Sequence, residues 1–86
     1  MTDTDAAILH AEVAALQAVL ISVLRKLAHE RPETIRDFCA AFDEAETVLT
    51  GLAVRLGDEP SSVTTINALR VVEEIRSGVL KPNACS

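Results

Sequence analysis

Aromatic residues are almost missing from this 86-residue chain, which has no Trp, no Tyr and only Phe38 and Phe42. Hydrophobic residues still make up 49% of the sequence, so any core must be built from aliphatic side chains and alanine. Such a core suits closely packed helices. A single domain of this size has a marginal core unless its apolar side chains are densely packed or a partner adds to it. The size of the chain alone therefore favours a second subunit that adds apolar contacts to the core.

Positive charge is also scarce. The chain has 8 Lys and Arg against 13 Asp and Glu, which gives a net charge of −5. Proteins that bind nucleic acid depend on clustered Lys and Arg to meet the phosphates. We therefore predict that neither nucleic acid nor an anionic membrane surface is a partner.

Cysteine is limited to Cys39, within a helical pattern, and Cys85. Two such residues do not form the disulfide framework of a small secreted domain, so we expect Cys39 to act as a small apolar residue and Cys85 to be an exposed thiol. The N-terminal residues MTDTDAAI lack the basic segment and cleavage signal of a secretory peptide. The apolar run from Val13 to Leu24 is shorter than the about 20 residues of a spanning helix. We expect a cytoplasmic protein with no membrane partner.

Motifs that carry chemistry are missing too. The sequence has no Ser-His-Asp set, no glycine-rich phosphate loop and no zinc motif. His10 with Glu12, and His29 with Glu33, provide too few ligands for a structural zinc site. We therefore predict no catalytic residue, no metal ligand, no cofactor-binding residue and no cofactor.

The strongest pattern lies between Leu9 and Leu27, where large aliphatic residues recur three and four apart, as in a heptad repeat. We call this set the heptad seam; it consists of Leu9, Val13, Leu16, Leu20, Val23 and Leu27. We expect the seam to pack against two further helices of the same chain. The remaining faces of this segment are also largely apolar, which is typical of a helix that is buried on most sides.

A second stripe on the same segment consists mainly of small residues. We call it the alanine stripe; its members are Ala7, Ala11, Ala14, Ala18 and Ile21. No predicted element of the chain is left to cover it, and small side chains let two backbones approach closely. We expect this stripe to be the interface with a second copy of the chain, related by a two-fold axis and antiparallel, or with a different protein.

Turn signals divide the chain into helices at about residues 3–28, 32–56 and 62–77. Thr2 and Asp5 have capping-box spacing, Pro32 suits the first turn of the second helix, and Gly57 suits its C-cap. Asp58, Ser61 and Ser62 are candidate N-caps of the third helix. We expect Gly78 to end that helix, which leaves a single helical domain over residues 1–78. Residues 79–86 should form a flexible tail unless Val79 and Leu80 dock on the bundle.

The predicted fold is therefore an all-α, three-helix up-down-up chain with a long first helix that completes a bundle by homodimerisation. Two more apolar faces are expected to be buried in it. On the second helix the face consists of Ile35, Phe38, Phe42, Ala45, Leu49, Leu52 and Leu56, and on the third of Val63, Ile66, Leu69, Val72 and Ile75.

Charged residues gather in two places. Asp37, Asp43, Glu44 and Glu46 give the second helix an acidic outer face, which is usually a solvated surface but could also meet a basic partner. Arg25, Lys26, Arg31 and Arg36 surround the first turn. We expect this cluster to be solvated and paired with Glu30 and Glu33.

These patterns favour a small non-catalytic interaction protein, namely an adaptor, regulator or assembly subunit that acts as a homodimer through helix–helix contacts. An antitoxin-like or inhibitor protein that uses the acidic face to neutralise a basic partner is the alternative. A helical enzyme similar to the chorismate mutases is the third hypothesis, but its site needs several Arg or Lys side chains inside the bundle. This chain has none before Arg25, so we expect no enzyme.

Overall fold

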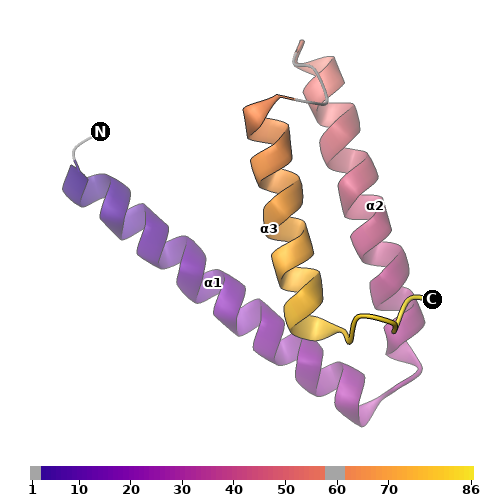
Figure 1. Cartoon of the computed structure of the whole chain (residues 1–86). Coiled ribbons are helices and arrows are strands. Elements are labelled where there is room, and N and C mark those ends of the chain that lie inside the picture. Colours follow the sequence, from indigo (N-terminus) through magenta and orange to yellow (C-terminus); the bar gives the residue numbers. More distant parts are fainter. Residues whose placement is uncertain (1–2, 58–61) are drawn as a thin grey trace.

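The computed structural model describes residues 3–57 and 62–86, and most of that part of the chain is helical. The helices are α1 (Asp3–Glu30), α2 (Thr34–Arg55) and α3 (Val63–Val79). α2 and α3 lie side by side and antiparallel, whereas α1 meets the C-terminal end of α3 and diverges from both (Figure 1). The predicted all-α fold with three helices and a long first helix is confirmed, and the described residues include no strand.

α1 and α3 meet closely at Gly78. A Cβ added to Gly78 would lie 2.9 Å from Cγ2 of Ile21, so the absence of a side chain lets the two helices approach. The prediction that Gly78 ends the third helix is wrong, because α3 continues through it to Val79. The glycine provides space for Ile21.

Five of the six members of the heptad seam do not face the other helices, contrary to expectation; only Leu27 is half-buried. Its members from Leu9 to Val23 keep between 44% and 70% of their surface exposed. The α1 side chains that are at least partly buried all lie in its C-terminal half; they are Gln17, Ile21, Leu24, Leu27 and Ala28. Most of the circumference of α1 is apolar, and heptad spacing alone does not say which face is covered. The contact with Gly78 selects the face that carries Ile21.

The α2–α3 hairpin contains the only two aromatic side chains. Five members of the predicted α2 face are half-buried: Ile35, Phe38, Phe42, Ala45 and Leu49. Leu52 and Leu56 are exposed, contrary to expectation, and Ala53 is buried instead. Positions spaced 3.5 residues apart drift by about 20° per heptad around a straight helix, so Ala53 takes the buried position that the heptad pattern gave to Leu52.

The first turn of α3 also buries a different side chain from the ones predicted. Val63 and Ile66 were expected to be buried but are exposed, whereas Thr65 is buried. Leu69, Val72 and Ile75, further along the predicted face, are half-buried.

Turn and capping residues set the helix ends. Gly57 has a φ of +84° directly after the last turn of α2, which confirms its predicted role as a C-terminal cap. The side chain of Ser62 accepts a hydrogen bond from the Thr65 backbone N–H at 3.2 Å, so Ser62 is the N-cap of α3; Asp58, Ser61 and Thr2 lie outside the described residues. α2 begins at Thr34 rather than at Pro32.

The C-terminal segment is attached to α2 by a disulfide between Cys39 and Cys85, with a sulfur–sulfur distance of 2.07 Å. The expectation of a free thiol at each position is therefore wrong. Residues 79–86 were expected to form a flexible tail, but Val79 and Leu80 are buried and the disulfide anchors the chain end near α2 (Figure 1). The two cysteines are 46 residues apart in the sequence, and pairing at that separation depends on the fold.

Reducing the disulfide should destabilise the chain by about 2–4 kcal/mol, because the cross-link restricts the unfolded state. Thermal melts with and without a reductant measure this effect. The Cys39→Ser/Cys85→Ser double variant is the control and should melt at the same temperature in both conditions. Identical melting of the reduced and oxidised wild-type chain would contradict the cross-link.

Gly78→Ala should lower the free energy of unfolding by about 1–3 kcal/mol, because the new methyl group overlaps Ile21. Gly51→Ala is the matched control: Gly51 lies within α2, and a Cβ there would meet nothing within 4 Å. That control should gain up to about 1 kcal/mol from helix propensity. Chemical denaturation of both variants checks the difference, and equal gains would show that α1 and α3 do not approach at Gly78.

Candidate protein-interaction surface

The chain exposes more surface than its mass requires. A compact monomer of 9.2 kDa exposes about 4,900 Å² according to the usual scaling of area with mass, whereas this chain exposes 6559 Å². Its radius of gyration is 14.9 Å, against about 12 Å for a compact domain of this length. The excess area of about 1,600 Å² exceeds the about 800 Å² that one partner buries in a standard interface.

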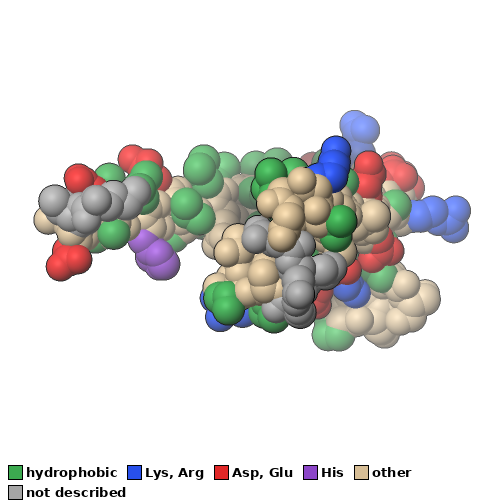
Figure 2. Space-filling view, turned by 90° about the horizontal axis from the view of Figure 1, so that it is seen from above, with side chains coloured by type: hydrophobic (Ala, Val, Ile, Leu, Met, Phe, Trp, Pro, Cys, Tyr) green, Lys and Arg blue, Asp and Glu red, His purple; other side chains and the backbone are tan. Residues whose placement is uncertain are grey.

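Much of the excess lies on α1. Every described side chain from Asp3 to Leu16 is exposed, and this half of α1 extends away from the α2–α3 hairpin (Figure 1). Seven large aliphatic residues of α1 are exposed: Ile8, Leu9, Val13, Leu16, Val19, Leu20 and Val23. Hydrophobic side chains are seen along the projecting helix in Figure 2. Contiguous apolar surface of this kind is typical of sites that contact another protein or a membrane.

The heptad seam and the alanine stripe lie on opposite sides of α1. Leu9 and Ala18 illustrate this, because they are nine residues apart and therefore about two and a half helical turns apart. Ala7, Ala11, Ala14 and Ala18 are exposed. Ile21 differs from them, since it is half-buried against Gly78. The expectation that no element of the chain covers Ile21 is therefore wrong.

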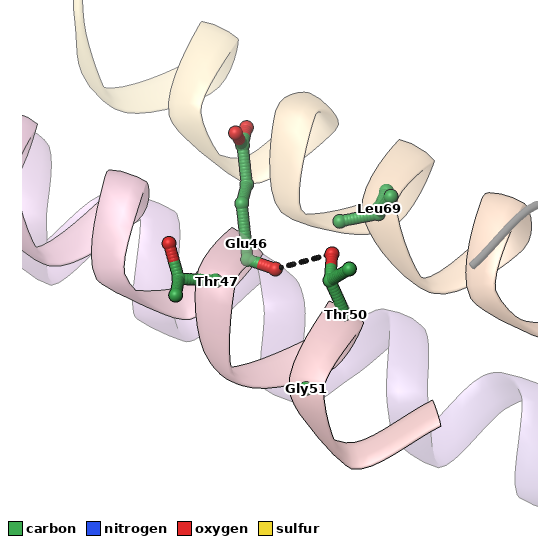
Figure 3. Close-up of a pocket in the computed structure, with 5 residues that line it drawn as sticks. All are labelled: Glu46, Thr47, Thr50, Gly51 and Leu69. Carbon is green, nitrogen blue, oxygen red and sulfur yellow. Dashed lines mark hydrogen bonds between the residues drawn. The ribbon is translucent and has the colours of Figure 1, made fainter. Parts of the chain in front are cut away.

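The acidic residues of α2 do not share one environment. Asp37, Asp43 and Glu44 are exposed, but Glu46 is half-buried and lines a cavity of about 640 Å³ between α2 and α3. Figure 3 shows the Glu46 side chain beside α3, with its backbone carbonyl accepting a hydrogen bond of 2.9 Å from the Thr50 hydroxyl. The acidic outer face is therefore smaller than the sequence indicated.

The structure gathers positive charge at the end of the molecule where α1 turns into α2. Arg25, Lys26, His29 and Lys81 line one cavity of about 860 Å³, which we call the basal cavity. Arg31 and Arg36, the other predicted members of the basic cluster, are exposed and do not line it. Sequence reasoning missed Lys81, because it reaches the cavity only through the course of the C-terminal segment.

Two further features bear on partners. α1 is long and apolar enough to cross a membrane, by length and composition alone, so the shortness of the run from Val13 to Leu24 does not exclude this. The absence of a membrane partner stays a prediction.

Within residues 3–57 and 62–86, no group of three or more His, Cys, Asp or Glu side chains could hold a metal ion.

Comparison of the chain with protein-family models, curated proteins and solved structures finds no match.

Reversing the charge of Asp43 and Glu44 with Lys should change the free energy of unfolding by less than about 1 kcal/mol, because both carboxylates are exposed. Glu46→Lys is the comparison variant and should cost more, since its side chain lies between two helices. Thermal melts check both variants. A sharp loss of stability in the Asp43→Lys/Glu44→Lys variant would show that this part of α2 is covered in solution and is not a free acidic face.

Proposed function

We propose that this chain is a small non-catalytic interaction protein, an adaptor, regulator or assembly subunit, that works as a homodimer through helix–helix contacts of α1. The observation that carries the proposal is the exposed heptad seam. Five of its members, from Leu9 to Val23, are at least 44% exposed. Burial of a single large aliphatic side chain contributes about 1.5–3 kcal/mol, so covering the seam would add substantially to a marginal core.

The seam is a better interface than the alanine stripe on physical grounds. Its leucine and valine side chains carry much more apolar area than alanine methyl groups, and their three-and-four spacing matches the knobs-into-holes contacts of paired helices. We therefore place the dimer contact on the heptad seam. The alanine stripe, on the opposite side of α1, remains the competing prediction.

Charge favours an antiparallel pair. The first turn of α1 carries Asp3 and Asp5, and Arg25 and Lys26 lie near its other end. Antiparallel pairing brings the acidic end of each helix toward the basic end of the other and opposes the two helix dipoles. Parallel pairing would place like charges side by side.

The spacing of the seam also permits a two-fold axis midway between Leu16 and Leu20. An antiparallel partner would then set Leu16 of one chain beside Leu20 of the other, and Val13 beside Val23. Every pair about this axis joins two members of the seam. A two-fold interface requires this kind of self-complementary pairing.

The disulfide bears on where the protein works. Cysteine pairs of this type persist in oxidising compartments and are rare in the cytosol. The Cys39–Cys85 cross-link therefore weighs against the cytoplasmic location, which stays a prediction.

Leu16→Glu should convert the dimer to monomer, because it places an unpaired charge at the centre of the contact. Ala14→Glu is the matched control: it introduces the same charge on the same helix but on the alanine stripe, and it should leave the dimer intact. Sedimentation equilibrium of the oxidised chain and both variants gives the masses.

If only Ala14→Glu dissociated the dimer, the interface would be the alanine stripe and not the heptad seam. A wild-type chain that is monomeric at high micromolar concentration would contradict the homodimer. Flotation of that monomer with neutral phospholipid vesicles would then show whether the seam meets lipid instead.

A further inference from the structure

We propose that the basal cavity binds an amphiphilic carboxylate, meaning a carboxylic acid with an apolar chain of medium length. The inference goes beyond the proposed function and does not depend on it. The cavity lies where the C-terminal half of α1, the start of α2 and the C-terminal segment converge. Its volume of about 860 Å³ falls within the about 300–1,000 Å³ of typical small-molecule sites.

The charged part of the cavity suits an anion. Arg25, Lys26 and Lys81 provide three cationic groups, and no Asp or Glu is among the residues that line the cavity. Lys26 pairs with Glu30 at 3.9 Å, and both of those side chains are mostly exposed. Such a local excess of positive charge is unusual in a chain whose net charge is −5. Arg can bind a carboxylate through two parallel hydrogen bonds.

The rest of the cavity suits an apolar chain. Ile35 and Pro82 line it with accessible apolar surface, and Ala28, Val79 and Leu80, which are buried, form its floor with a small remaining area. Inorganic phosphate or acetate would use the cations but make little contact with Ile35 and Pro82. Mostly apolar walls with a few convergent polar groups are the usual composition of a small-molecule site, and here the two parts match the two ends of an amphiphilic acid.

The disulfide holds one wall of the cavity in place. Ala84 lines the cavity and directly precedes Cys85, which is bonded to Cys39 of α2. Cys39 follows the lining residue Ile35 by four residues, which is about one helical turn. Reduction frees the C-terminal segment from α2, so the cavity should bind its ligand best in the oxidised chain.

A titration of the intact oxidised chain with decanoate, followed by amide chemical shifts in NMR, tests the proposal. We expect saturable shifts at Gly78, Leu80 and Ala84, and none of similar size at Leu16. Decanol, which keeps the apolar chain without the charge, should bind at least about tenfold more weakly, and so should acetate. Reduction of the disulfide should also weaken the binding of decanoate.

Arg25→Gln and Lys81→Gln should each raise the dissociation constant for decanoate about tenfold. Arg36→Gln is the matched control, because Arg36 is exposed and does not line the cavity; it should bind like the wild type. Equal binding of decanoate and decanol, shifts confined to the heptad seam, or unchanged affinity in the Arg25→Gln/Lys81→Gln variant would overturn the proposal. The Leu16→Glu variant should still bind decanoate, so failure of the dimer and failure of the cavity are distinguishable.

Discussion

The close approach of α1 and α3 at Gly78 determines how the rest of the molecule is exposed. Ile21 occupies the space that a side chain at position 78 would need, so α1 turns that face toward α3. The heptad seam, on another face of the same helix, is left in solvent. Because the contact lies near the C-terminal end of α3, the N-terminal half of α1 extends away from the other helices, and its side chains from Asp3 to Leu16 are exposed (Figure 1). One glycine thus decides which apolar face is available to a partner.

The C-terminal segment has a second structural role. After α3 ends, Leu80 takes an extended conformation and is buried together with Val79. The disulfide then joins the segment to α2. These contacts add buried apolar area to a small core and close one side of the basal cavity. The fold of the hairpin end therefore depends on the part of the sequence with the weakest secondary-structure signal.

Helix number, helix type and most helix ends could be predicted from the sequence, because they depend on local signals such as Gly57 and Ser62. The choice of buried face on α1 could not, because most of its faces are apolar and only the approach of α3 distinguishes them. Heptad spacing also misplaced Leu52, since the buried face of α2 follows the period of a straight helix. Ile66 was misplaced for another reason: residues spaced only three apart wind around a helix of 3.6 residues per turn and do not stay on one face. The disulfide between Cys39 and Cys85 could not be predicted, because it depends on the path of the whole chain. The same holds for the position of Lys81 beside the basic residues at the end of α1.

We propose that a second copy of the chain covers the heptad seam. The most direct measurement is an isotope-filtered NOE experiment on an equal mixture of labelled and unlabelled chains in their oxidised form. A dimer through the seam should give intermolecular contacts between its methyl groups, with Val13 close to Val23 and Leu16 close to Leu20 of the other chain. Intermolecular contacts restricted to Ala7, Ala11, Ala14 and Ala18, or none at concentrations where the chain is dimeric, would contradict it.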